Sequence, residues 1–461
     1  MVMRVVVVGG GISGLAAAHA LAARGDVAVT ICEADEHLGG KIRTEVFAGS
    51  LLDVGPDAFL ARRPEAVRLC RDLDLADELV SPVATSAHLW AQTRLRRLPS
   101  GLALGVPTRF GPLVRSRVLS PAGLARVAVE PLLPGRPLGE DEALGALVRR
   151  RLGGEVHRRL VDPLVGGINA GDTDRLSADV AAPTVADAAR RHRSLMVGAR
   201  RQAGAADSGA GPVFLTLPGG LSRLVEALAG RLADGGADIR VGERITGLEP
   251  EGDGRYVVHA TSAALPADAV VMAVPALAAA PLLAPHAPGP AAALAAVEYA
   301  SVALVAVAYP ASAVGRRLDG SGFLVARGEG YLMTACSWAS SKWAHLDAGD
   351  RVLLRVSAGR AGDARVDSLR DGALVSRLRR ELETILDVSK PPSDVRVTRW
   401  PRAFPQYAPG HARRIADVET ELAACLPGVV LAGAALAGVG LPACIASGQR
   451  AAQRVYDSLQ P

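Results

Sequence analysis

The sequence predicts an α/β fold in which a parallel sheet is joined to a mixed sheet and to a mostly helical lobe. Three observations predict it. Residues 4–45 alternate apolar runs with a glycine cluster and an alanine-rich segment, as a strand–helix–strand unit does. Residues 100–165 are rich in Leu and Arg and contain several prolines, which indicates short helices. Residues 237–310 hold short β-rich runs between turn residues.

The elements follow in order along the chain. "RVVVV" at 4–8 predicts a buried strand, residues 11–25 a helix that ends at Gly25, and residues 27–33 a second strand. Charged residues alternate with leucines over 62–80, which predicts an amphipathic helix, and the Gly/Ala/Ser-rich stretch 198–211 predicts a mobile loop or linker. We further expect a helix within 212–232, strands at 237–250, 255–261, 269–275, 296–310 and 351–358, and a helix over 371–387.

Composition narrows the function classes. The net charge is +5, but aromatic residues make up only 3% and lysine occurs only at positions 41, 342 and 390, so nucleic-acid binding is disfavoured and an anionic small molecule fits as well. The five cysteines are odd in number, form no CxxC pair and show no metal-ligand spacing, which predicts no metal site and a reducing, cytoplasmic setting. These cysteines are Cys32, Cys70, Cys336, Cys425 and Cys444.

Two uncharged stretches raise the question of a membrane span. Residues 271–284 are interrupted by Pro275, and residues 429–446 by three glycines and Pro442. Glycine costs about 1 kcal/mol and proline about 3 kcal/mol per helix position. We therefore expect no integral membrane segment, and a glycine-rich turn that approaches a ligand is the better interpretation of the second stretch.

A GxGxxG motif lies where the first strand meets the first helix. Gly9 allows the tight turn, Gly11 lets the backbone approach a pyrophosphate, and Gly14 lets the helix pack on the sheet. The helix N-terminus at Ile12 and Ser13 directs N–H groups and positive dipole at the phosphates. Nineteen residues after Gly14, an acidic residue ends the second strand and is positioned to accept hydrogen bonds from a ribose; it is Glu33. This context predicts a Rossmann-type dinucleotide site.

Further motifs resemble the glutathione-reductase-type FAD proteins, and within them the amine-oxidase superfamily. The stretch "EADEHLGGKIRT" at 33–44 is similar to their second fingerprint, and "LLDVGPDAF" at 51–59 to the segment beside the flavin. "VGERITGL" at 241–248 is similar to the strand that meets the adenine, and 431–452 to the glycine-rich turn and helix against the flavin ring. The resemblance implies FAD as cofactor, bound also by Gly40, Lys41, Arg43, Gly55, Pro56, Asp57, Val241, Gly440, Leu441 and Pro442.

Narrower motifs, at 163–177, 214–224, 320–327, 334–345 and 399–411, resemble the porphyrinogen oxidases of haem synthesis, and most closely the coproporphyrin-forming type of Gram-positive bacteria and actinobacteria. The resemblance implies an FAD-dependent enzyme that oxidises coproporphyrinogen III to coproporphyrin III. Three hydrides would pass to FAD, dioxygen would reoxidise the cofactor, and hydrogen peroxide would be released. The resemblance also makes a ferrochelatase a partner to consider.

The same resemblance suggests substrate residues. The backbone at Gly167 would face the macrocycle and assist orientation or proton loss, while Arg63 and Lys342 would meet propionates and Leu277 would line the pocket. The closing motif departs from its relatives. Ala435 and Leu436 stand where an aromatic or serine pair is usual, and Ala443 where an Asp is usual.

Three alternatives remain open at the level of sequence. A protoporphyrinogen IX oxidase differs only in its substrate. A flavin amine oxidase usually places a lysine near the flavin and an aromatic pair around the amine, which this sequence does not match at Ala435 and Leu436. A non-catalytic FAD- or NAD-binding protein is the third.

We expect the FAD-binding domain to be divided along the chain. Its first segment spans 1–85, a helical lobe 86–165, crossover segments between the FAD-binding and substrate domains 166–275, the substrate-binding domain 276–400, and the last FAD-binding segment 401–461.

Overall fold

A five-stranded parallel sheet forms the centre of one half of the molecule. The computed structural model describes residues 2–133, 139–206, 211–252, 254–347 and 349–460. The strand order is β11-β2-β1-β15-β21, so the chain returns to this sheet from positions far apart in the sequence. The strands are β1 (Met3–Val8), β2 (Val27–Cys32), β11 (Asp238–Arg240), β15 (Ala269–Met272) and β21 (Val429–Leu431).

The valine run of β1 is buried on both faces of this sheet, as expected for a central parallel strand. Val5 and Val7 pack under the helices of one face, while Val6 and Val8 pack on the opposite face against a three-stranded antiparallel sheet and further helices. The first face carries α1 (Ile12–Ala22), α2 (Pro64–Asp72), α11 (Ser222–Asp234) and α19 (Leu441–Leu459). The second carries β12 (Ile245–Pro250), β13 (Tyr256–Ala260), β14 (Ala264–Ala267), α12 (Ala276–Leu283), α13 (Pro288–Ala295) and α17 (His411–Cys425).

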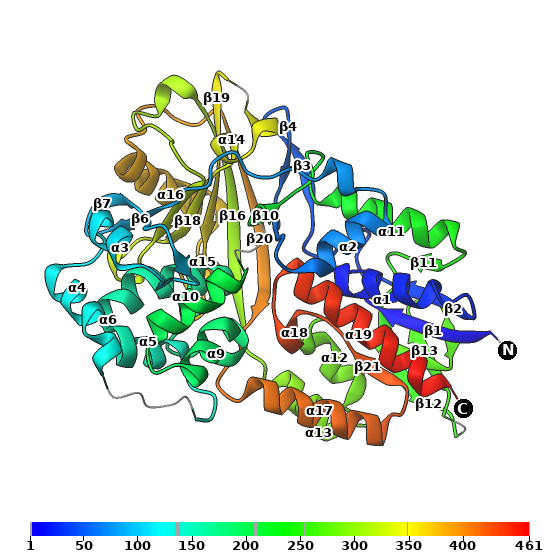
Figure 1. Ribbon diagram of the computed structural model, residues 1–461. Helices are drawn as coiled ribbons and strands as arrows, with labels where there is room; N and C mark the ends of the chain where they lie inside the picture. Colours follow the sequence, from blue (N-terminus) through cyan, green and yellow to red (C-terminus); the bar gives the residue numbers. More distant parts are fainter. Residues whose placement is uncertain (1, 134–138, 207–210, 253, 348, 461) are drawn as a thin grey trace.

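A seven-stranded sheet forms the second layer, in the order β20-β16-β19-β18-β17-β6-β7. Figure 1 shows it rising beside the parallel-sheet half, with α16 on its outer face. All its pairings are antiparallel except that of β17 with β6. Its elements are β6 (His88–Ala91), β7 (Arg94–Arg97), β16 (Tyr299–Pro310), β17 (Gly322–Val325), β18 (Met333–Trp338), α14 (Ala339–Lys342), β19 (Arg351–Ala358), α15 (Arg365–Ser368), α16 (Asp371–Leu386) and β20 (Asp394–Pro405).

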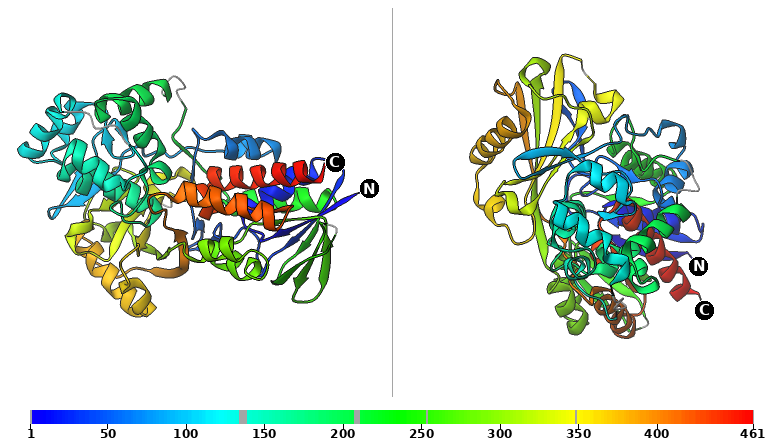
Figure 2. Two further views of the ribbon diagram at one scale, coloured as in Figure 1. Left: turned by 90° about the horizontal axis from the view of Figure 1, so that it is seen from below. Right: turned by 60° about the vertical axis from the view of Figure 1, so that its left-hand side comes forward.

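A helical lobe lies at the end of the molecule opposite the parallel sheet (Figure 1, Figure 2). Its helices share one apolar core, to which Leu147, Val161, Val185 and Leu195 contribute fully buried side chains. The lobe contains β8 (Leu102–Ala103), β9 (Val106–Pro107), α3 (Phe110–Ser116), α4 (Pro121–Ala128), α5 (Leu144–Leu152), α6 (Gly154–Val156), the π-helix η3 (His157–Gly166), α7 (Gly167–Asn169), α8 (Ala178–Ala181), α9 (Pro183–Arg191) and α10 (Leu195–Ala206).

The α/β fold class, with its mixed sheet and helical lobe, is confirmed, and β19 and β16 lie where the sequence predicted strands. Four local predictions need correction. The predicted helix at 62–80 ends at Asp72, because Asp74 adopts a left-handed backbone with φ of 60°. The strand predicted over 237–250 is two strands in different sheets.

The other two corrections concern the lobe. Residues 86–97, predicted to belong to the helical lobe, form β6 and β7 at the edge of the seven-stranded sheet, because β6 pairs with β17. Residues 198–206, predicted as a mobile loop, belong to α10, since Leu195 and Ala199 are buried in the lobe core; residues 207–210 lie outside the described residues. The described lobe therefore extends beyond the predicted boundary at 166.

Smaller elements connect these layers. The hairpin of β3 and β4 leads from the parallel-sheet half toward the seven-stranded sheet, and α18 precedes the last helix. These elements are β3 (Thr44–Phe47), β4 (Ser50–Asp53), β5 (Phe59–Leu60), β10 (Phe214–Leu215) and α18 (Ala434–Ala437). None of the helices in the described ranges has the length and apolar character needed to cross a membrane.

The contact between α1 and α19 predicts a strict requirement for glycine at position 448. A Cβ at Gly448 would lie 2.1 Å from the backbone oxygen of Ser13 and 3.0 Å from the backbone nitrogen of Ala17. Since neither backbone atom can yield without moving α1, Gly448→Ala is expected to lower the free energy of unfolding by about 1–3 kcal/mol, as overpacking does. Urea denaturation measures the change.

The matched control is Gly230→Ala in the middle of α11, where nothing lies within 4 Å of an added Cβ. There we expect unchanged or slightly higher stability, by about 0.5–1 kcal/mol. Equal effects of the two substitutions would contradict the role given to the α1–α19 contact.

Asp53 predicts a pH dependence of stability. Its buried carboxylate accepts hydrogen bonds from the Thr44 hydroxyl at 2.6 Å and the Leu221 N–H at 2.9 Å. Burial nevertheless raises the pKa of Asp53 from 3.8 to about 6. Between these values the folded state binds the proton more tightly than the unfolded chain, so the contribution of Asp53 to stability falls as the pH rises from 4 to 6.

Asp53→Asn keeps an acceptor oxygen and removes this titration. We compare the unfolding free energy of the variant with that of the unsubstituted protein. The difference, variant minus unsubstituted, should increase by up to about 3 kcal/mol as the pH is raised from 4 to 7. Unfolding free energies across this pH range check it, with the exposed Asp234→Asn as control. Parallel pH profiles for Asp53→Asn and the unsubstituted protein would refute the assignment.

Candidate functional site

One long cavity of about 750 Å³ runs between the parallel-sheet half, the seven-stranded sheet and the helical lobe. One part is walled by the turn after β1, the end of β2 and the loop after β4. The other part is walled by the end of the π-helix, α7 and strands of the seven-stranded sheet. The cavity therefore brings segments from the two ends of the chain and its middle to one place.

The glycine-rich turn after β1 forms one wall. Gly9 has a φ of 106°, and a Cβ there would lie 2.9 Å from the backbone oxygen of Ala273, whereas the Cβ position of Gly11 faces open space. A Cβ on Gly14 would collide with the backbone oxygen of Gly9 at 1.9 Å. Gly9 and Gly11 line the cavity and Gly14 packs behind it. This arrangement is a cradle in which backbone N–H groups can approach a phosphate.

Glu33 is held beside this cradle. Its carboxylate accepts hydrogen bonds from the Gly10 N–H at 2.7 Å and from the Asp35 N–H at 2.8 Å. Each oxygen has a further lone pair, and the side chain lines the cavity. Glu33 can therefore accept hydrogen bonds from a ribose hydroxyl without releasing the turn.

A second helix N-terminus meets the cavity where α19 begins. Gly440 and Leu441 line it, and Pro442 occupies the first turn, where its missing N–H costs no hydrogen bond. Gly438 has a φ of 139°, and a Cβ there would lie 3.3 Å from the side chain of Ala443. The positive end of this helix suits an electron-rich ring edge or an anion.

Two side chains form hydrogen bonds with the backbone of α18, where Ala435 and Leu436 depart from the family pattern. One belongs to α17 and the other to the segment just before it. The Tyr407 hydroxyl donates a hydrogen bond to the backbone oxygen of Ala434 at 2.7 Å. The His411 ring forms a hydrogen bond with the backbone oxygen of Ala435 at 2.8 Å. Burial raises the pKa of Tyr407 and lowers that of His411, so both remain neutral near pH 7. These hydrogen bonds fix the backbone of the turn, although residues 435 and 436 have aliphatic side chains.

An ion cluster closes the middle of the cavity. The Asp57 carboxylate lies 2.8 Å from Lys342 Nζ and 2.8 Å from Arg355 Nη1, and the Arg355 guanidinium also donates to the Gly55 carbonyl. Burial alone would raise the pKa of Asp57, but the two cations outweigh it and hold the pKa well below its ordinary value. The cluster joins the loop after β4 to β19 of the seven-stranded sheet.

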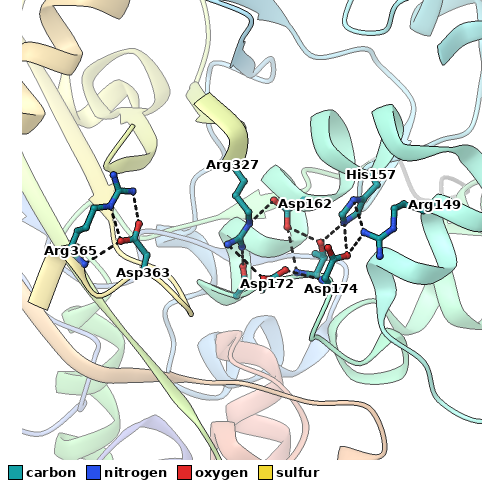
Figure 3. Close-up of polar contacts among 10 residues, drawn as sticks. Arg149, His157, Asp162, Asp172, Asp174, Arg327, Asp363 and Arg365 are labelled. Carbon is teal, nitrogen blue, oxygen red and sulfur yellow. Dashed lines mark hydrogen bonds and ion pairs between the residues drawn. The ribbon is translucent and has the colours of Figure 1, made fainter. Parts of the chain in front are cut away.

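The far part of the cavity is bounded by the π-helix and the turn at Gly167, which lines it. Asp162, on the π-helix, accepts from the Thr173 hydroxyl at 2.7 Å and pairs with Arg327 at 3.3 Å. The network continues to the lobe surface through His157, whose pKa is lowered by burial (Figure 3). These contacts fix the Gly167 turn against the seven-stranded sheet.

Most predicted cofactor residues meet in the cavity. Those lining it are Gly9, Gly11, Ile12, Ser13, Glu33, Gly40, Lys41, Gly55, Pro56, Asp57, Gly440 and Leu441, together with Gly167. Outside the lining are Gly14, Arg43, Arg63, Val241, Leu277, Lys342 and Pro442.

Three of those outside the lining were expected to contact substrate. Arg63 is exposed at the start of α2, Leu277 is half-buried on α12, and Lys342 forms an ion pair with Asp57. Val241 is 44% exposed between β11 and β12, and Arg244, three residues on, lines the cavity. Their roles in binding stay predictions.

The sequence analysis did not identify four arginines that line the cavity: Arg244, Arg327, Arg355 and Arg360. A signal existed for Arg355, because it stands between Leu354 and Val356 within the predicted strand 351–358. Arg327 lies inside a stretch singled out for its resemblance, without being singled out itself.

The near part of the cavity fits a dinucleotide. A flavin adenine dinucleotide needs three kinds of group, and all are present here. They are a glycine turn without side chains, two helix N-termini and an acidic side chain at the end of β2. Gly9, Gly11 and Ser13 would hold its pyrophosphate, Glu33 its ribose, and Gly440 and Leu441 its ring. Bound there, FAD supplies the hydride acceptor.

The ion cluster predicts a large effect of Asp57→Asn. The substitution leaves Arg355, whose side chain is 8% exposed, and Lys342 without their carboxylate. We expect a loss of about 3–5 kcal/mol of unfolding free energy and reduced flavin retention. Urea denaturation and flavin absorbance after gel filtration measure both. Asp350→Asn, at a side chain that is 82% exposed, is the control and should cost less than about 1 kcal/mol; a similar loss there would contradict the prediction.

Comparison with known proteins agrees with this geometry. The family model for flavin containing amine oxidoreductases matches residues 12–456. The coproporphyrinogen III oxidase of Bacillus subtilis is 34% identical over 97% of this chain and 96% of its own length. That of Mycobacterium bovis is 38% identical over 98% of this chain and 97% of its own length.

Solved structures of other proteins share this fold. A crystal structure from Exiguobacterium sp. 255-15, provisionally assigned as a protoporphyrinogen oxidase, superposes with a TM-score of 0.87 at 32% identity over the whole of both chains. Cyclohexylamine oxidase from Brevibacterium oxydans superposes with a TM-score of 0.71 at 18% identity, which shows a shared fold. The predicted FAD cofactor is thereby confirmed, and this chain belongs to the flavin-containing amine oxidoreductase family as an FAD-dependent oxidase.

Proposed function

We propose that this chain oxidises coproporphyrinogen III to coproporphyrin III in haem synthesis. The substrate would lose three hydrides and three protons, for which bound FAD would supply the hydride acceptor, and three molecules of dioxygen would leave as hydrogen peroxide. The observation that carries the proposal is the continuity of the cavity, from the glycine cradle to a second part walled by the Gly167 turn and rich in arginine. Relatives named coproporphyrinogen III oxidase, matched nearly end to end, support it.

The far part of the cavity suits a large ring with acidic side chains. Val302, Leu304 and Val325 from the seven-stranded sheet give it apolar walls, which favour an uncharged macrocycle. Backbone at the Gly167 turn would orient the pyrrole N–H groups and assist proton loss. The arginines at the edge would meet carboxylates.

Protoporphyrinogen IX is the second candidate substrate, because the Exiguobacterium structure carries that assignment. It has two propionates where coproporphyrinogen has four. The relatives named coproporphyrinogen III oxidase, matched over nearly the whole chain, favour the substrate with four propionates. Amine oxidation is disfavoured, since aliphatic Ala435 and Leu436 stand at the position of the aromatic pair.

The odd number and wide spacing of the cysteines support a reducing setting, so we place the enzyme in the cytoplasm. A ferrochelatase that inserts iron into the product is the partner we propose to test first.

Anaerobically prepared porphyrinogens test the function. After enzyme and air are added, porphyrin fluorescence should rise with both substrates, with kcat/KM for coproporphyrinogen III roughly tenfold higher, the value of one charge-assisted hydrogen bond of about 1.5 kcal/mol. Hydrogen peroxide should accumulate at three equivalents per porphyrin formed. The uncatalysed rate in air without enzyme is subtracted. A clear preference for protoporphyrinogen IX would move the assignment to the second candidate.

A further inference from the structure

Arg360 follows β19 at the far part of the cavity. It lines the cavity, and its side chain is partly buried. The next residue, Ala361, donates its N–H to the backbone oxygen of Ala170 at 2.7 Å, which anchors this segment to the turn that contains Gly167. Arg360 therefore stands beside the wall that we assign to the substrate ring.

The carboxylates that act on Arg360 are already engaged by other arginines. Asp363 accepts two hydrogen bonds from Arg365, at 2.8 and 2.6 Å, and Asp162 pairs with Arg327 (Figure 3). Asp172 also lies 3.9 Å from Arg327. Within the described ranges none of these three carboxylates forms an ion pair with Arg360.

The other arginines of this wall are occupied as well. Arg327 donates to the Gly171 carbonyl at 2.6 Å in addition to its ion pair, and Arg355 is bonded to Asp57 and Gly55. In contrast, the side chain of Arg360 has no hydrogen bond or ion pair within the described ranges. Of these three guanidinium groups, Arg360 is the one that has its donors open to a ligand.

Burial, followed by repulsion from Arg327, lowers the pKa of Arg360, although a guanidinium stays protonated at any physiological pH. A half-buried cation without a partner is costly, and a ligand that supplies a carboxylate removes that cost. The planar fork of guanidinium donors matches a carboxylate with two parallel hydrogen bonds.

We propose that Arg360 binds a carboxylate of the substrate macrocycle. This inference rests on the proposed function, because it takes the far part of the cavity to hold the macrocycle. It makes Arg360 a substrate-binding residue. The contact with the substrate carboxylate would then lie beside the Gly167 turn. Arg63, the residue that the sequence predicted for such a contact, lies at the start of α2.

Steady-state kinetics of four variants test the assignment. Arg360→Ala is expected to raise KM for coproporphyrinogen III by roughly 10- to 100-fold with little change in kcat, because it removes a charge-assisted contact made in the bound state. Arg360→Lys should restore part of the affinity. Arg379→Ala, on the exposed face of α16, removes the same charge away from the cavity and should change KM less than about twofold. Arg63→Ala compares the sequence-based candidate directly.

A binding measurement separates this inference from the proposed function. Coproporphyrin III and its uncharged tetramethyl ester are titrated into the flavin-loaded protein, and quenching of porphyrin fluorescence gives Kd. Arg360→Ala should weaken binding of the acid and leave that of the ester unchanged. If the unsubstituted enzyme fails to oxidise coproporphyrinogen III while this difference persists, the function fails and the carboxylate site stands.

The inference is overturned if Arg360→Ala leaves KM for coproporphyrinogen III and Kd for coproporphyrin III unchanged in a protein of normal flavin content. It is also overturned if acid and ester lose affinity equally, because that result indicates a role in packing. A rise in KM confined to Arg63→Ala would transfer the carboxylate contact to α2.

Discussion

One carboxylate, Asp57, joins the two halves on which the site depends. The loop that carries it leaves the parallel-sheet half, while its partners Lys342 and Arg355 belong to the seven-stranded sheet and the helix beside it. The same loop is bonded through the Trp400 indole, which donates to the Val54 carbonyl at 2.8 Å. Because these contacts are buried and mutually satisfied, the cofactor cradle and the far part of the cavity are held at a set separation.

Ion pairs around the cavity then determine which charged side chains can still bind a ligand. Acids that come from the π-helix and from the segment after β19 neutralise Arg327 and Arg365, and the Asp57 cluster neutralises Arg355. Among the described residues at the far part of the wall, the guanidinium of Arg360 is left without a partner, beside backbone at the Gly167 turn. A site of this kind binds and orients its substrate, while the redox chemistry resides in the cofactor.

Much of the near part of the cavity follows from local sequence. Gly9, Gly11 and Glu33 were predicted from a strand, a turn and a helix that are contiguous in the chain, and all three line the cavity. The segments 86–97 and 198–206 were misassigned. Their structure comes from pairing with β17 and from burial in the lobe core, and both partners are remote in sequence.

The sequence by itself determined the parallel-sheet unit, the glycine cradle and the nature of the cofactor, because short-range periodicity and tight-turn geometry are encoded within a few tens of residues. Only the tertiary structure decided which cations are neutralised. Lys342, which was predicted to bind substrate, is bonded to Asp57, 285 positions away, while Arg360 carried no sequence signal and stands open at the cavity wall. The physical reason is that the availability of a charged group depends on which opposite charges the fold brings within a few ångströms of it, and such neighbours leave no local pattern in the chain.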